Sequence, residues 1–266
     1  MLVHMKKQNK TSPRNKSTVI RDETAAIRFA DYLLAQAKQF EGKRSGKKTK
    51  LLLLASAAKL FDIVAPQDLR VSDICKGANA SQGTYYLHFE TKTDIVIELL
   101  SRFVDFEVGT MPVFARDSHP FENVLKIVHW YEDTFRLNFG IMLYLVRLSD
   151  VHAELAETWR RRGGFVVDRL LQWIAPYYGL NEDEDRHVRH MCFSVGSMMD
   201  ESLFARFGVH AAAKSSQQED SELETELQAL LIYRGIFSGN PPAEMLTVGK
   251  VFLPLIQVDS VSGKRI

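Results

Sequence analysis

The side chains with the clearest chemistry in this sequence lie between residues 71 and 89. Two short periodic segments, 71–78 and 81–89, are separated only by Asn79-Ala80. So tight a corner between two helices requires one residue at positive φ, and after glycine asparagine tolerates that conformation best. The spacing therefore predicts two helices joined by a sharp turn at Asn79.

The second of these segments has polar side chains at nearly every outward position. Ser81 can cap the helix through its hydroxyl, and Tyr85 and Phe89 are apolar members of the same segment. Recognition helices read base edges with their first turn and contact phosphates with hydroxyls further along. The candidates for such contacts are Ser81, Gln82, Thr84, Tyr85, Tyr86 and His88.

The charge is distributed unevenly along the chain. Residues 1–92 hold 17 Lys and Arg against 8 Asp and Glu, a net charge of +9, whereas the remainder holds 17 against 25, a net charge of −8. Five cations fall within residues 43–50, and Lys47 and Lys48 among them are candidate phosphate contacts. This asymmetry is typical of a DNA-binding end on an acidic body, although a basic tail on an acidic enzyme would have the same charge pattern.

Almost every segment after residue 46 has the apolar period of an amphipathic helix, and none alternates as a strand does. The expected helices cover residues 47–62, 71–77, 81–89, 92–108, 120–138, 139–149, 152–178, 182–207 and 222–238. Residues 21–40 predict one extra helix before them. The predicted fold is all-α, with about nine helices plus the N-terminal one, a three-helix DNA-binding end and a helical body.

We expect four regions in the chain. Residues 1–46 form an extension with one helix and a basic linker, of which 1–16 are polar, aperiodic and expected to be disordered. Residues 47–92 form the helix-turn-helix domain, 93–238 a ligand-binding and dimerisation domain, and 239–266 a C-terminal tail. Residues 211–220 are small and polar and are expected to form a loop.

The composition excludes several classes of protein. Two cysteines are too few for a disulfide framework, and we expect both Cys75 and Cys192 to be packed in the core. Neither a signal segment nor a membrane span is evident, so we expect a cytoplasmic protein without membrane contact. No catalytic motif, cofactor loop or zinc-hydrolase motif occurs, and we expect no enzyme activity and no cofactor.

Residues 50–92 also resemble a known family. The residues that carry the resemblance are Leu53-Leu54, Ala57, Leu60-Phe61, the segment 74–78, and the run Ser81-x-Gly83-Thr84-x-Tyr86-x-x-Phe89-x-x-Lys92. In this combination the segment is similar to the DNA-binding end of the tetracycline-repressor (TetR) family of bacterial regulators. The resemblance implies base contacts from Gln82 and Thr84, and phosphate contacts from Tyr86, His88 and Lys92.

The sequence departs from the family pattern in its turns and caps. Ala65-Pro66 stands where the first helix usually ends in glycine, Arg70 replaces the usual threonine cap, and Asn79 replaces a common glycine. Arg70 could add a phosphate contact. Beyond Phe106 the resemblance is architectural only, because the bodies of this family share helices and little sequence.

The resemblance implies a homodimer whose interface is built by the last two helices. The segment 182–207 agrees, because it is apolar along two stripes. One stripe can face its own bundle, and the other, which includes Gly196, could face a second copy. The final segment has a matching apolar stripe from Leu223 to Phe237.

The body contains candidates for an effector site, although plain core packing is the alternative for each of them. A largely apolar cavity with a few polar groups is typical of small-molecule sites. The candidates are His129, Trp130, Tyr144, Arg147, Trp159, Trp173, Met198 and Asp200. We expect residues 160–162, three consecutive arginines, to form a solvated face.

A metal site is not expected. Glu184, His187 and His190 have a spacing that could approach one ion, but they have no second set of ligands.

The sequence as a whole predicts a homodimeric regulator, most simply a repressor, that binds a palindromic DNA operator and is released by a small, largely apolar effector. The alternatives are a DNA-binding architectural protein of the same fold without an inducer, and a helical enzyme with a basic tail.

Overall fold

The computed structural model describes residues 27–40, 46–178, 182–208, 218–237, 239–251 and 253. These residues form ten α-helices and no strand, which confirms the predicted all-α fold. The helices are α1 (Phe29–Lys38), α2 (Gly46–Phe61), α3 (Val71–Ala78), α4 (Gln82–Tyr86), α5 (Lys92–Thr110), α6 (Pro120–Leu137), α7 (Phe139–Ser149), α8 (Ala153–Tyr178), α9 (Glu182–Phe207) and α10 (Gln218–Phe237). Three 3₁₀ turns, η1 (Pro66–Asp68), η3 (Ala243–Met245) and η4 (Gly249–Val251), complete the elements.

Three helix boundaries differ from the sequence prediction by three residues or more. The N-terminal helix begins only at Phe29, because Arg28 is extended at φ −67° and ψ 132°. The recognition segment is helical only from Gln82 to Tyr86. Helix α10 begins at Gln218, so the end of the expected loop 211–220 is helical. Residues 1–16, which we expected to be disordered, lie outside the described residues.

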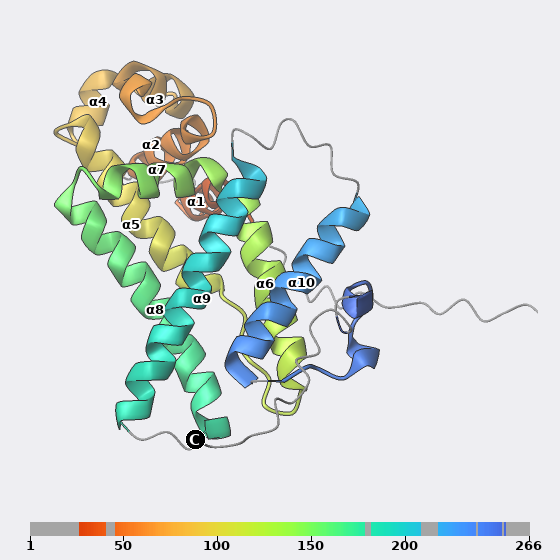
Figure 1. Ribbon diagram of the computed structural model, residues 1–266. Coiled ribbons are helices and arrows are strands. Elements are labelled where there is room, and N and C mark those ends of the chain that lie inside the picture. Colours follow the sequence, from red (N-terminus) through yellow and green to blue (C-terminus); the bar gives the residue numbers. More distant parts are fainter. Residues whose placement is uncertain are drawn as a thin grey trace, which may run out of the picture.

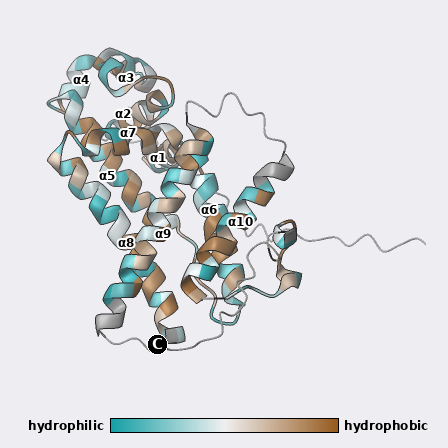
Figure 2. Cartoon of the chain, viewed as in Figure 1, coloured by the Kyte–Doolittle hydropathy of each residue, from teal (hydrophilic) through white to brown (hydrophobic). Residues whose placement is uncertain are grey.

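The helices are arranged as a small head at one end of a longer bundle (Figure 1). Helices α2, α3 and α4 form the head, and α5 runs from the head along α8 into the body. Helices α6, α8, α9 and α10 extend away from the head, and α7 crosses between the two parts. Figure 2 shows hydrophilic residues on the outer side of α3 and α4. Within the described residues, no helix is both long and apolar enough to cross a membrane.

Helix α1 is part of the core. Phe29, Leu33 and Ala37, on one face of α1, are buried. The Phe29 ring lies 5.5 Å from the ring of Phe103 and 5.2 Å from that of Phe106, both in α5. The extra helix is thereby held against both α2 and α5.

Helix α7 lies directly on the end of α2. A side chain at Gly140 would collide with the backbone of Phe61, so glycine is required for this approach. The ring of Tyr144 stacks on that of Phe61 at 3.7 Å, and its hydroxyl donates to the Val64 carbonyl at 2.8 Å. Burial raises the pKa of Tyr144 to about 12, so the phenol keeps its proton and remains a donor to this carbonyl.

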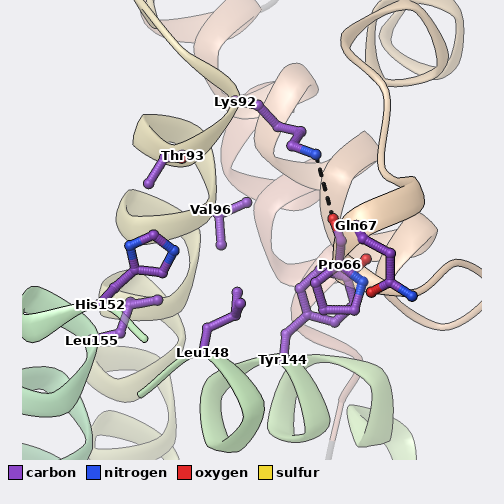
Figure 3. Close-up of a pocket in the computed structure, with 9 residues that line it drawn as sticks. All are labelled: Pro66, Gln67, Lys92, Thr93, Val96, Tyr144, Leu148, His152 and Leu155. Atoms are coloured by element: carbon purple, nitrogen blue, oxygen red, sulfur yellow. Dashed lines mark hydrogen bonds between the residues drawn. The ribbon is translucent and has the colours of Figure 1, made fainter. Parts of the chain in front are cut away.

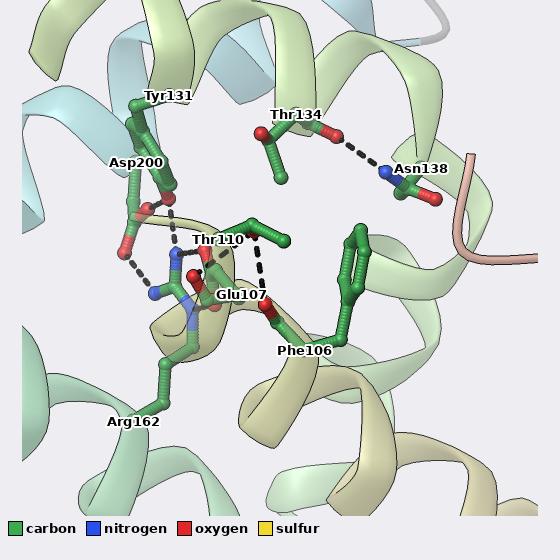
Figure 4. A network of polar contacts seen from close by, with 8 residues as sticks. All are labelled: Phe106, Glu107, Thr110, Tyr131, Thr134, Asn138, Arg162 and Asp200. Atoms are coloured by element: carbon green, nitrogen blue, oxygen red, sulfur yellow. Dashed lines mark hydrogen bonds and ion pairs between the residues drawn. The ribbon is translucent and has the colours of Figure 1, made fainter. Parts of the chain in front are cut away.

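Arg162 joins four helices through a buried polar network (Figure 4). Its guanidinium donates to both oxygens of Glu107, at 2.6 and 2.8 Å, to Asp200 at 3.2 Å, and to the hydroxyl of Tyr131. Burial alone would lower the pKa of Arg162, but the charge of Glu107 and the other partners outweigh it and raise the pKa. The expectation of a solvated face at 160–162 is therefore wrong for Arg162, because its neighbours in space are acids distant in sequence.

A second buried carboxylate ties α6 to α9 and α10. Glu132 accepts from Arg206 at 2.8 Å and from the hydroxyl of Thr225 at 2.5 Å. Burial raises the pKa of Glu132, and the hydrogen bond from Thr225 and the charge of Arg206 partly offset this effect. Both carboxylates thus fix helices whose sequence positions are far apart.

The Arg162 network leads to a prediction about stability. Arg162→Leu leaves Glu107 and Asp200 without their cation, and breaking such a buried pair costs about 3–5 kcal/mol. We expect the free energy of unfolding in urea to fall by about this amount. Arg160→Leu is the matched control because Arg160 is exposed, and it should change stability by less than about 0.5 kcal/mol. Equal stability of the two variants would contradict the role assigned to the network.

Candidate DNA-binding interface

Helices α3 and α4 form the helix-turn-helix predicted from the sequence. Asn79 adopts the left-handed conformation, at φ 51° and ψ 46°, and among the described residues no other non-glycine residue has positive φ. The backbone N–H groups of Asn79 and Ala80 donate back to Lys76 and Cys75 and close the first helix. The predicted corner at Asn79 is confirmed.

The crossing of α3 over α2 depends on Gly77. A side chain at this position would overlap the hydroxyl of Ser56, which donates to the Ile74 carbonyl at 2.9 Å. Ala78, the last residue of α3, is half-buried at the edge of the core. Cys75 is buried and packed in the core, as predicted.

The start of α4 is fixed by its cap. The hydroxyl of Ser81 accepts from the backbone N–H of Thr84 at 3.0 Å, as predicted. The hydroxyls of Ser81 and Thr84 also lie 2.8 Å apart, so the Thr84 side chain is held by the cap. This side chain is half-buried. The first turn of the recognition helix is therefore rigid before it meets any partner.

Tyr85 is not available for contact with DNA. Its side chain is fully buried, and its hydroxyl donates to the Thr91 carbonyl at 3.0 Å. Burial raises the pKa of this phenol well above its ordinary value. Our assignment of Tyr85 to the DNA-contacting set is therefore wrong, because α4 is so short that one side of it must complete the core of the head.

The outer face of α4 presents Gln82, Tyr86 and Leu87. The Tyr86 side chain is 54% exposed and that of Leu87 is 83% exposed, and Gln82 is exposed as well. Leu87 was missed in the sequence. Because it lies two positions from each of the buried residues Tyr85 and Phe89, helical periodicity places it on the opposite face and could have identified it.

The end of the recognition segment touches the start of α2. His88 is half-buried, and its Cε1 lies 3.4 Å from where a side chain of Gly46 would begin. Lys47 and Lys48 follow directly, Lys47 exposed and Lys48 half-buried. Lys50 forms an ion pair with Glu98 at 2.6 Å.

Lys92 opens α5 beside the head. Thr91 and Asp94 form a reciprocal capping box at 3.2 and 2.7 Å, which fixes this helix start. The ammonium of Lys92 donates to the Pro66 carbonyl at 3.4 Å (Figure 3). Arg70, at the cap position of α3, is exposed and makes no capping hydrogen bond. Arg70 thus directly precedes the helix-turn-helix, and Lys92 opens the helix that follows it.

The candidate effector residues have different surroundings in the fold. Three of them, His129, Arg147 and Met198, are exposed. Tyr144 packs on α2 instead, and Asp200 is a partner of Arg162 and of Tyr131. These surroundings were not predictable, because a helical period indicates which face of a helix is apolar and does not indicate which helix covers it.

The three tryptophans of that set lie in separate surroundings. Trp130 is buried, and the ring of Trp159 lies 5.0 Å from the guanidinium carbon of Arg162. Trp173 is buried between Phe114, at 4.6 Å between ring centres, and Phe237, at 5.9 Å. Among the residues that the structure describes, its indole N–H has no hydrogen-bond acceptor, which is costly for a buried donor.

Helix α9 turns the Gly196 stripe inward. Cys192, Met199 and Leu203 of that stripe are buried in the bundle, and Gly196 is half-buried at its edge. The expectation that this stripe faces outward is therefore wrong, although the predicted burial of Cys192 is confirmed. The outward face consists of His190, Phe193, Ser194, Ser197, Met198 and Glu201.

The structure does not bring the possible metal ligands Glu184, His187 and His190 of α9 together with further ligands in the part of the chain that it describes. His187 and His190 are exposed, and the side chain of Glu184 lies outside the described ones. In the part of the chain that the structure describes, no three His, Cys, Asp or Glu side chains are grouped as metal ligands.

Comparison with known proteins agrees with this geometry. Residues 53–99 match the family model described as "Bacterial regulatory proteins, tetR family". The HTH-type transcriptional regulator EthR of Mycobacterium tuberculosis is 35% identical over 204 residues, which cover 72% of this chain and 91% of EthR. EthR of Mycobacterium bovis matches to the same extent.

Solved structures share the fold at low sequence identity. A tetR-family transcriptional regulator from Streptomyces coelicolor superposes with a TM-score of 0.59 at 15% identity, covering 71% of this chain and 79% of that one. The fatty acid degradation regulator FadR of Bacillus halodurans superposes at 0.52 with 18% identity, covering 73% and 97%.

The identity to EthR, the matched helix-turn-helix segment and the shared fold converge on one conclusion. The chain belongs to the TetR family of DNA-binding transcriptional regulators.

Proposed function

We propose that the protein is a cytoplasmic, homodimeric repressor that binds a palindromic operator and is released by a small effector. The observation that carries this proposal is the outward face of α4, with exposed Gln82 and Tyr86 flanked by the cations that surround the head. Residues 47–92 would read DNA, and residues 93–238 would bind the effector and the second copy.

The side chains divide into two kinds of contact. Gln82 and Thr84, in the first turn of α4, would meet base edges in the major groove. The phosphate contacts would come from Lys47, Lys48, Arg70, Ser81, Tyr86, His88 and Lys92. Two heads can bind together when their half-sites lie about 34–36 Å apart, one helical turn of DNA.

The outward face of α9 supports the homodimer. Phe193 is 54% exposed and Met198 is 42% exposed, with Ser194 and Ser197 between them. Exposed aromatic and methionine side chains among small residues are typical of protein interfaces. Leu231 adds an exposed apolar side chain on α10.

The surroundings of Trp173 support an effector in the body. The buried indole N–H has no acceptor in the described part of the chain, and with the aromatic rings around it suits a largely apolar molecule that carries one hydrogen-bond acceptor. An architectural DNA-binding protein of this fold would need no such group. Mass spectrometry of small molecules that copurify with the protein distinguishes the two, because an architectural protein would carry none.

The first functional prediction compares two neighbouring tyrosines. Tyr86→Phe removes an exposed hydroxyl, and we expect affinity for duplex DNA to fall by about 1–2 kcal/mol at unchanged stability, because a hydrogen bond to phosphate is lost. Tyr85→Phe is the matched control and should instead lower stability by about 1 kcal/mol, because its buried bond to Thr91 is lost. Fluorescence anisotropy and urea unfolding measure the two effects, and unchanged DNA affinity in Tyr86→Phe would refute the phosphate contact.

The second concerns Lys92. Lys92→Ala should weaken binding to all duplex sequences alike and lower the slope of log affinity against log salt by about one, since one phosphate contact disappears. Arg147→Ala removes an exposed cation of α7 and should leave the slope unchanged. An unaltered slope in Lys92→Ala would remove this residue from the interface.

The third concerns the dimer. Phe193→Asp places a charge on the outward face of α9, and we expect sedimentation to show monomers because an unpaired charge would be buried between the two copies. Val151→Asp is the control, since Val151 is 71% exposed in the turn between α7 and α8. If Phe193→Asp sediments as the unmodified protein does, the interface lies on another face.

A further inference from the structure

A groove of about 280 Å³ lies where the head meets the body (Figure 3). The turn η1 and the start of α5 form one side, and the end of α7 and the start of α8 form the other. The lining residues are Pro66, Gln67, Lys92, Thr93, Val96, Tyr144, Leu148, His152 and Leu155. None of the candidate effector residues except Tyr144 is among them.

The lining has the chemistry of an anion site above an apolar floor. It includes two basic side chains, Lys92 and His152, and no acidic one. Gln67 and Thr93 add an amide and a hydroxyl, and Val96 and two leucines supply aliphatic surface. Such a combination complements a molecule with one negative group and a short apolar chain.

Lys92 is the residue that an anion would engage. Its ammonium donates to the neutral carbonyl of Pro66 at 3.4 Å, which is long for a hydrogen bond. A carboxylate is a stronger acceptor for an ammonium than an amide carbonyl is. Lys92 also occupies the first position of α5, where the helix dipole favours negative charge.

We propose that this groove binds a small aliphatic monocarboxylate, which takes Lys92 away from DNA. The effect on DNA rests on the proposed function, because Lys92 can be withdrawn only if it contacts a phosphate. The apolar chain lies on Val96 and Leu148 and the carboxylate pairs with Lys92. A ligand shifts an equilibrium only through unequal affinity for two states, and competition for one cation supplies that inequality.

The position of the groove adds a second effect. Its walls belong to elements on both sides of the contact between Tyr144 and Val64, which joins α7 to the chain after α2. An occupant between Pro66 and Leu148 therefore bears on the angle between head and body. The two heads of a dimer must keep their spacing to bind successive major grooves.

Isothermal titration calorimetry with hexanoate tests the site. We expect hexanoate to bind the full-length protein at one equivalent per chain, and hexanol to bind at least about tenfold more weakly because it lacks the charge. Lys92→Ala should weaken hexanoate binding about tenfold, and Leu148→Trp, which fills the groove, should abolish it. Arg147→Ala, next to Leu148 but outside the lining, should bind as the unmodified protein does.

Two results would overturn the site. One is that the unmodified protein does not bind hexanoate, and the other is that Lys92→Ala and Leu148→Trp bind hexanoate as tightly as the unmodified protein does. If Leu148→Trp fails to fold by circular dichroism, Lys92→Ala decides alone. Fluorescence anisotropy with a random-sequence duplex then tests the coupling. Hexanoate should weaken DNA binding by the unmodified protein and leave Leu148→Trp unaffected, and equal weakening of both would overturn the competition. If the unmodified protein binds no duplex in the absence of hexanoate, the proposed function is contradicted. Calorimetry still decides whether the groove binds hexanoate.

Discussion

The arrangement of the body depends on the hydrogen bonds and ion pairs of the buried Arg162 guanidinium. A cation enclosed by two carboxylates and a phenol can be satisfied in one geometry only, since each partner comes from a different helix. Helices α5, α6, α8 and α9 are therefore fixed relative to one another at a single point. One member of the network, Glu107, belongs to α5, the helix that begins at Lys92 shortly after the recognition segment. A movement of α8 or α9 that disturbed Asp200 would thus act on α5 directly.

The junction between head and body is the second constraint, and it is built from backbone contacts more than from charges. Gly140 allows α7 to approach the end of α2, Tyr144 reaches the Val64 carbonyl, and α1 packs against both α2 and α5. The head is consequently held on two sides, by α7 and by α1. Rotation of the head requires these contacts to loosen together, so any regulator of its orientation must act at this junction or through α5.

Local chemistry explains what could be predicted from the sequence. The corner at Asn79 and the cap at Ser81 depend on residues within four positions of each other, and both are confirmed. The failures involve partners far apart in the chain. Arg162 is buried against Glu107, which lies 55 positions away in the sequence. Tyr144 packs on α2 because its ring stacks on that of Phe61. Periodicity likewise found two apolar stripes on α9, but only the packing of α8 and α10 decides which of them is covered.

The first turn of α4 is held more tightly than the ammonium of Lys92. The first turn of α4 is fixed by Ser81 and by buried Tyr85, so the reading surface itself has little freedom. Lys92 is different, because among the described residues its ammonium has only a long bond, to the carbonyl of Pro66. Affinity for DNA in such a protein depends strongly on charge, and a cation that exchanges partners changes it at little structural cost. Regulation is therefore easier at the rim of the head, where the bond of Lys92 is long, than at the start of α4, where Thr84 and Tyr85 are held by hydrogen bonds within the fold.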